Sequence, residues 1–70
     1  MEKFYSLWRK HGKDIALMDD VPTYETKSAA FKKAKELQKD LVYGTSDSIL
    51  VRKITVGSLK ATQWEFAPRT

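Results

Sequence analysis

A single segment of this chain has the spacing of an amphipathic helix, and this feature most limits the possible folds. Apolar residues between positions 27 and 41 recur at intervals of four, three and four, which is the period of a helix packed along one side. Thr26 is the predicted N-cap, and Gly44 is suited to a left-handed C-cap. One helix can cover only one face of a sheet, so any sheet in this chain has a second face that the helix leaves open.

Four other segments are rich in β-branched and aromatic residues, which are typical of strands. They are residues 3–10, 14–18, 48–56 and 59–66. Gly12 lies between the first two segments and Gly57 between the last two, and glycine accepts the positive φ that tight hairpin turns require. The order strand, strand, helix, strand, strand predicts an α+β fold, ββαββ, in which an antiparallel sheet is packed by one α-helix.

The two glycines also predict how the strands of each hairpin pair. The predicted loop of the first hairpin is His11-Gly12. This loop sets Arg9 opposite Asp14, a favourable cross-strand pair of opposite charges, whereas a three-residue loop would shift the register. The predicted loop of the second hairpin consists of residues 57–58.

The composition suits one small folded domain without disulfides. The chain has 70 residues, 41% of them hydrophobic, and no cysteine, so aliphatic and aromatic packing must stabilise it. We expect a single domain over residues 1–70, ordered from about 3 to 67, with a flexible tail at 68–70. No apolar run approaches the roughly 20 residues of a membrane helix, and the N-terminal segment does not resemble a signal peptide. These features predict a cytoplasmic protein that does not bind membranes.

The residue types required for catalysis or metal binding are scarce. His11 is the only histidine and falls in a predicted turn. Without cysteine, the chain cannot form a Cys–His catalytic pair or a cysteine-containing zinc site. The three glycines are isolated from one another, so there is no glycine-rich loop to hold a phosphate. We therefore expect no catalytic residue, no metal site, no cofactor and no small-molecule substrate.

Alternation along the predicted strands divides each hairpin into two faces. The first hairpin has one face with a tryptophan and one without: Phe4, Ser6, Trp8, Ile15 and Leu17 against Tyr5, Leu7, Ala16 and Met18. The second divides in the same way: Ile49, Val51, Trp64 and Phe66 against Leu50, Arg52, Ile54, Val56 and Leu59. Both faces carry apolar residues, so a patch stays uncovered whichever face the helix covers. We predict that the bulkier set, with both tryptophans, faces the helix.

The predicted uncovered face is apolar with a basic rim. Its residues are Tyr5, Leu7, Arg9, Met18, Leu50, Arg52, Ile54 and Val56. Such a patch usually marks an interaction surface. The leading hypothesis is therefore a non-catalytic interaction or regulatory protein that binds a protein partner or a second copy of itself, and the small size fits a phage or mobile-element modulator of a host protein. The alternative is a twisted sheet whose edges are covered by the loop at Tyr43 and by the C-terminal tail, since small domains often expose scattered apolar residues harmlessly.

The charge supports a second hypothesis, a nucleic-acid-binding regulator. Thirteen Lys and Arg against nine Asp and Glu give a net charge of +4, which favours an anionic partner. The candidate phosphate contacts are lysines at the tip of the first hairpin and on one flank of the helix: Lys10, Lys13, Lys32, Lys35 and Lys39. Acidic residues interrupt this flank, so the lysines also suit an ordinary solvated helix face. Salt dependence separates the two hypotheses, since binding to phosphates weakens steeply with salt.

Overall fold

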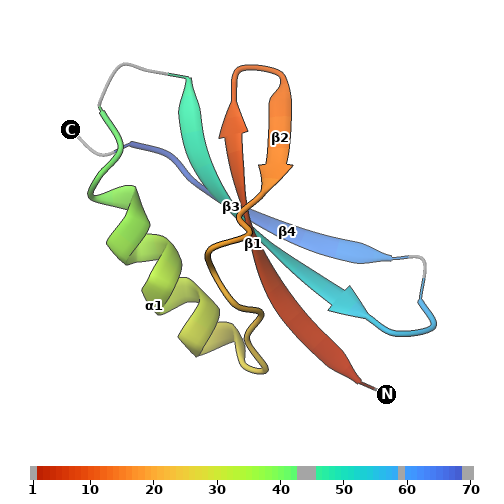
Figure 1. Cartoon of the computed structure of the whole chain (residues 1–70). Coiled ribbons are helices and arrows are strands. Elements are labelled where there is room, and N and C mark those ends of the chain that lie inside the picture. Colours follow the sequence, from red (N-terminus) through yellow and green to blue (C-terminus); the bar gives the residue numbers. More distant parts are fainter. Residues whose placement is uncertain (1, 43–45, 59, 69–70) are drawn as a thin grey trace.

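Four antiparallel strands form one sheet, and a single helix packs on one of its faces (Figure 1). The computed structural model describes residues 2–42, 46–58 and 60–68. Its elements are β1 (Lys3–His11), β2 (Asp14–Leu17), α1 (Lys27–Gln38), β3 (Asp47–Thr55) and β4 (Ala61–Phe66). The strands lie in the order β2-β1-β3-β4, with every neighbouring pair antiparallel. The predicted α+β class, its ββαββ order and its single packing helix are confirmed.

The first hairpin turns one residue later than predicted. His11 pairs with Asp14, so the two loop residues are Gly12 and Lys13. Gly12 has a φ of +60°, and no described residue other than glycine has a positive φ. This combination matches a type II′ turn, which places glycine first of its two central residues. The predicted pairing of Arg9 with Asp14 is therefore wrong. The observed register differs from the predicted one by two positions along β2, and because side chains alternate with a period of two, the predicted division of this hairpin into faces is unchanged.

The second hairpin has the predicted register. Val51 lies opposite Trp64, as a loop at residues 57–58 requires. The Ser58 amide donates a hydrogen bond of 3.1 Å to the Thr55 carbonyl, and Gly57 between them has a φ of +84°. A type II turn needs a positive φ at this third position, which explains the glycine. Leu59, predicted to begin the last strand, lies outside the described residues, and β4 begins at Ala61.

The helix begins as predicted and ends three residues early. Thr26 accepts a hydrogen bond of 3.3 Å from the Ala29 amide through its side-chain oxygen, which confirms it as the N-cap. After α1 ends at Gln38, the Leu41 amide donates a hydrogen bond to the Gln38 carbonyl, three residues back. A bond over three residues is typical of a 3₁₀ turn, which is tighter than the α-helix. The predicted cap at Gly44 lies outside the described residues.

Two alanines bring the helix close to the sheet. Ala30 and Ala34 are fully buried against strand residues that include Ile49 and Val51. Larger side chains close the borders of this contact. The ring of Phe31 meets those of Trp64 and Phe66 edge to face, with centroids 5.2 Å and 5.1 Å apart. The predicted grouping of apolar residues of the second hairpin beneath the helix is confirmed.

The predicted match between the faces of the two hairpins is wrong. Tyr5 and Leu7 are 5% and 1% exposed and belong to the core beneath α1, so the tryptophan-containing face of β1 points away from the helix. The cause is the pairing of β1 with β3, which sets Leu7 opposite Val51 and Trp8 opposite Leu50. Alternation within a hairpin decides which residues share a face, but only this long-range register decides which face meets the helix.

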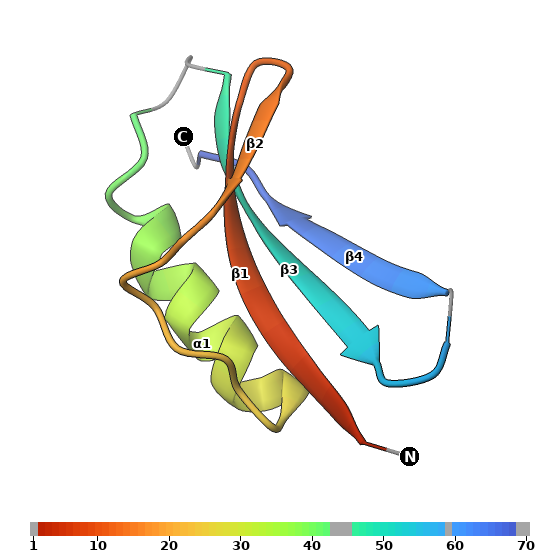
Figure 2. The same ribbon diagram turned by 45° about the vertical axis from the view of Figure 1, so that its right-hand side comes forward.

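The connection from β2 to α1 covers the edge of β1 that β2 leaves open (Figure 2). β2 pairs only with the part of β1 from Trp8 to His11. Closer to the N-terminus, Tyr24 exchanges two backbone hydrogen bonds with Tyr5, of 2.7 Å and 2.9 Å. The Met18 amide bonds to the Leu7 carbonyl at 3.2 Å, and Met18 itself packs against the core. The backbone hydrogen-bonding groups along this edge of the sheet are therefore largely paired within the chain itself.

A matched pair of leucines tests the corrected faces. We expect Leu7→Ala to lower the free energy of unfolding by about 2–5 kcal/mol, because it empties a buried site beneath the helix. Leu17→Ala should cost about 1 kcal/mol or less, because Leu17 is 49% exposed on the opposite face. Urea unfolding measures both values. Equal costs, or a larger cost at Leu17, would show that the faces are assigned incorrectly.

Candidate functional site

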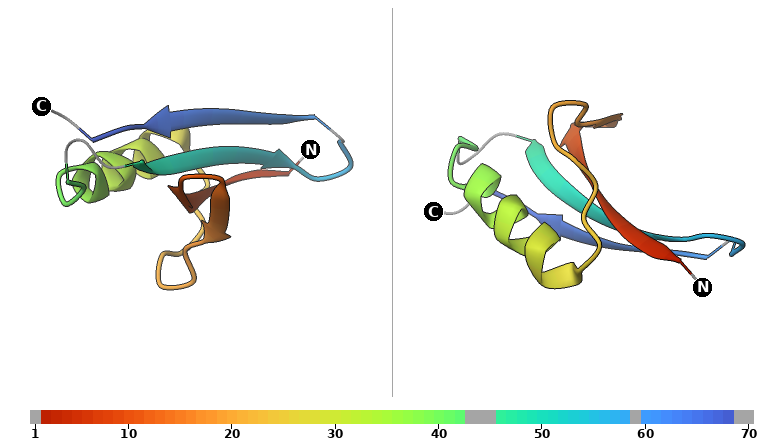
Figure 3. Two further views of the ribbon diagram at one scale, coloured as in Figure 1. Left: turned by 90° about the horizontal axis from the view of Figure 1, so that it is seen from above. Right: turned by 60° about the horizontal axis from the view of Figure 1, so that its bottom comes forward.

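The sheet face opposite α1 is a candidate surface, and we call it the open face. In Figure 3 the helix lies on one side of the sheet, which leaves the other side without a helix. The alternation of the strands and their register place these residues on it: Phe4, Ser6, Trp8, Lys10, Ile15, Leu17, Ser48, Leu50, Arg52, Ile54, Ala61, Gln63 and Glu65.

A tryptophan and an arginine organise the middle of the open face. The Trp8 indole donates a hydrogen bond of 2.9 Å to the hydroxyl of Ser6. The guanidinium of Arg52 lies 4.6 Å from the centroid of the Trp8 ring, which is a cation–π contact. Arg52 also donates from Nε to the side-chain carbonyl of Gln63 at 2.8 Å. These contacts link β1, β3 and β4 and hold both large side chains in one arrangement.

An ion pair crosses the same face. Lys10 of β1 and Glu65 of β4 lie on either side of β3, and their charged atoms are 3.8 Å apart. Leu50, on β3 between Trp8 and Glu65, is fully buried even though no helix covers this face. The protein therefore closes the middle of the open face with its own side chains.

The accessible apolar part of the open face lies at its β2 end. Ile15 and Leu17 are 42% and 49% exposed. They share this face with Trp8, which lies directly opposite Leu17 and is half-buried. Phe4 and Ile54 are also half-buried and lie opposite each other on β1 and β3. We call Trp8, Ile15 and Leu17 the apolar patch, whereas Phe4 and Ile54 lie toward the other end of the β1–β3 pair.

Most of the predicted protein-binding residues lie elsewhere. Tyr5, Leu7 and Met18 pack in the core, and Leu50 is buried. Arg9 alternates onto the helix side of β1, where it binds an aspartate. Val56 lies in the turn after β3 and is exposed there.

Arg52 and Ile54 remain on the open face as predicted. Trp8, Ile15 and Leu17 lie on the open face but are absent from the predicted set, although alternation along the first hairpin places them together. Only the choice of which face meets the helix was wrong, and no local pattern in the sequence contains that information.

The predicted nucleic-acid contacts are divided between the two sides of the sheet. Lys10 lies on the open face and is paired with Glu65. Lys32 and Lys35 belong to α1, which packs on the opposite face, and Lys39 directly follows that helix. Lys13 lies in the hairpin turn and is exposed. The five lysines therefore do not form one continuous surface.

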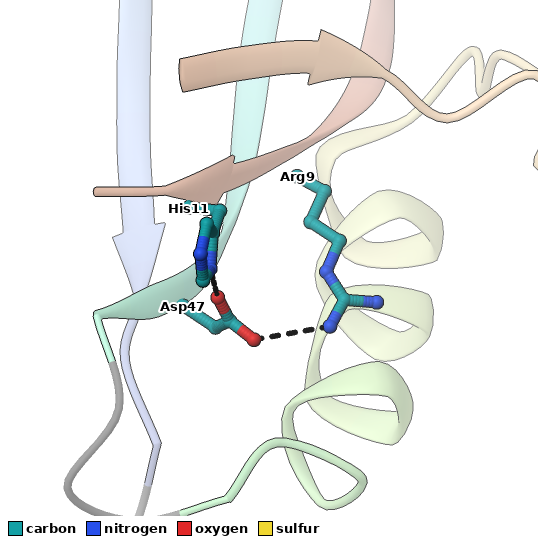
Figure 4. Close-up of polar contacts among 3 residues, drawn as sticks. All are labelled: Arg9, His11 and Asp47. Atoms are coloured by element: carbon teal, nitrogen blue, oxygen red, sulfur yellow. Dashed lines mark hydrogen bonds and ion pairs between the residues drawn. The ribbon is translucent and has the colours of Figure 1, made fainter. Parts of the chain in front are cut away.

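A polar cluster lies where β1 ends and β3 begins (Figure 4). His11 is the last residue of β1 and faces Asp47, the first residue of β3, so it lies in a strand and not in the turn. Arg9 and His11 both reach the Asp47 carboxylate, Arg9 at 3.1 Å and His11 through Nδ1. The carboxylate side chain is 16% exposed, whereas Arg9 and His11 are 54% and 72% exposed.

The electrostatics of this cluster favour an ionised aspartate. The hydrogen bond from His11, followed by that from Arg9, holds the pKa of Asp47 below its usual value of 3.8. Chemically the arrangement can anchor the end of the β1–β3 pair. Two surface depressions, of about 420 and 220 Å³, are lined by other residues, among them Glu2 and Tyr24.

Residues 2–42, 46–58 and 60–68 contain no group of three or more histidine or acidic side chains placed to hold a metal ion. No helix in these ranges has the length and apolar character needed to cross a membrane.

Comparisons with models of known protein families, with curated proteins and with solved structures found no match to this chain.

The Asp47 cluster predicts a specific pH dependence of stability. Because its folded pKa is depressed, Asp47 stabilises the fold at pH values above the unfolded pKa, and this contribution is lost as the pH falls through the folded pKa. We expect urea unfolding at pH 7 to show Asp47→Asn as less stable than the wild type, with the difference shrinking below about pH 3.8. Asp19→Asn, in the connection after β2, controls for the loss of one negative charge. A difference that stays constant with pH would contradict the role of the cluster.

Proposed function

We propose that this protein is a non-catalytic binding protein whose open face engages a partner protein. The observation that carries this proposal is the apolar patch. Ile15 and Leu17 are large apolar side chains, about half exposed, and adjacent to a half-buried tryptophan on a sheet face without a helix. Exposed apolar patches with polar rims are typical of protein interaction surfaces. Tryptophan and arginine are also the side chains most enriched at the energetic centres of such surfaces.

The charge on the open face indicates the chemistry of the partner. Arg52 and Lys10 lie beside the apolar patch, Glu65 is the one acidic residue among the strand residues placed on this face above, and the whole chain carries a net charge of +4. A partner with apolar side chains flanked by acidic ones would complement this surface. A second copy docked through the same face would bring two basic surfaces together, which disfavours self-association there.

The polar cluster supports binding over catalysis. Arg9 and His11 are mostly exposed, and the two depressions described above are lined by other residues. A catalytic base needs a substrate held within hydrogen-bond reach. A structural role at the end of the β1–β3 pair accounts for the observed contacts. The small size of the chain suits a regulatory protein that acts by occupying a surface of a larger one, as phage and mobile-element modulators do.

Two substitutions on neighbouring residues of β2 test the proposal. Leu17→Lys places a charge in the apolar patch, and burying an unpaired charge in an interface is costly. Ala16→Lys adds the same charge to the same strand on its other face, where Ala16 is also exposed. We expect capture from a lysate of the source cells, treated with nuclease, to retain one acidic protein on the wild type and on Ala16→Lys. Leu17→Lys should lose it.

The other outcomes would contradict the proposal. A captured protein that Leu17→Lys retains would bind elsewhere on the surface. Binding that disappears with nuclease, and weakens steeply as salt rises, would indicate nucleic acid as the partner. In that case Lys13→Ala should weaken binding and reduce the salt dependence.

A further inference from the structure

We propose that β4 pairs, edge to edge and antiparallel, with β4 of a second copy of this protein, so that the two sheets become one. The two edges of the sheet differ in how well they are protected, and Figures 2 and 3 show them on opposite sides of the molecule. This inference is independent of the open face and of the partner proposed above.

The edge formed by β2 and β1 is protected against pairing. β2 is only four residues long, and short edge strands offer few free backbone groups. The N-terminal half of β1 is covered by the two backbone hydrogen bonds between Tyr5 and Tyr24. Both devices are common in proteins that avoid unwanted strand addition.

The edge formed by β4 has no comparable protection. β4 extends over six residues, and no other described strand pairs with it on the side away from β3. Its sequence contains no lysine, arginine or proline, the residues that most often block an edge. Its one charged residue, Glu65, is already paired with Lys10. A row of backbone donors and acceptors is thus available for another strand.

A second copy of the same strand satisfies this edge without a charge conflict. In a twofold antiparallel pair, the residue on the axis lies opposite its own copy, and each face continues onto the same face of the partner. The middle of β4 is at Gln63 and Trp64. An axis at Gln63 sets Glu65 opposite Ala61, and an axis at Trp64 sets it opposite Gln63. Neither arrangement brings the two Glu65 side chains opposite each other.

Two threonine variants test the edge. Thr62→Lys adds a lysine within β4, where Thr62 is exposed, and Thr23→Lys makes the same change in the connection beside the opposite edge. In sedimentation velocity over a range of concentrations, we expect the wild type to form a dimer. Thr62→Lys should raise its dissociation constant at least about tenfold, because edge lysines must be desolvated on pairing. Thr23→Lys should leave the constant unchanged.

A distance measurement locates the contact directly. Because the chain has no cysteine, Gln63→Cys accepts a nitroxide label at a single position. Paired strands lie about 4.8 Å apart, so two labels near the axis should give a short distance by pulsed electron paramagnetic resonance. Labels at Thr23→Cys, beside the opposite edge, should give a long one.

Three results would overturn the proposal. The first is a wild type that stays monomeric at every concentration. The second is a dimer in which the labels at position 63 are far apart. The third is a dimer that Leu17→Lys dissociates and Thr62→Lys does not, since this dimer would form through the apolar patch. The edge proposal would then be wrong, whatever partner the open face binds.

Discussion

The antiparallel pairing of β1 with β3 is the constraint on which the rest of the structure depends. The two strands pair along their whole length, from Lys3 opposite Thr55 to His11 opposite Asp47, and they join hairpins that are far apart in the sequence. This register places Tyr5 and Leu7 with Val51 beneath the helix. It also brings Asp47 to Arg9 and His11, so the far end of the pair is held by charge as well as by backbone hydrogen bonds.

The two faces of the sheet are stabilised by different means. On the helix side, two buried alanines allow close approach, and aromatic rings surround the contact. On the open face, Arg52 stacks on Trp8 and bonds to Gln63, while Lys10 reaches Glu65. Long side chains with apolar stems and charged ends can cover apolar surface while remaining hydrated. A sheet with one helix therefore buries Leu50 on the face that the helix does not cover.

This division of roles leaves the two surfaces on which the proposed interactions depend. The apolar patch lies at the β2 end of the open face, where Ile15 and Leu17 are about half exposed. The β4 edge is left because no other described strand pairs with β4 on the side away from β3. A dimer paired through β4 would set two open faces side by side, and each would keep its own apolar patch accessible to a partner.

The sequence by itself determined the local elements. The spacing of apolar residues and Thr26 predicted the helix and its start, Gly12 and Gly57 predicted the two hairpins, and alternation correctly divided each hairpin into faces. These features depend on backbone propensities and on periods of a few residues, which a sequence displays directly. The exact loop at Gly12 was wrong by one residue, because the type II′ turn depends on φ values that the sequence does not state.

Only the tertiary structure decided which faces of the two hairpins lie on the same side of the sheet. This choice also decided which residues form the candidate site. Both faces of the first hairpin are apolar, and the less bulky one, with Tyr5 and Leu7, is the one beneath the helix, so composition could not choose between them. The choice depends on the register of β1 against β3, on the fit of Ala30 and Ala34 over the strands, and on the contact between Trp8 and Arg52. All of these contacts join residues distant in the chain, and their geometry exists only after the two hairpins have met.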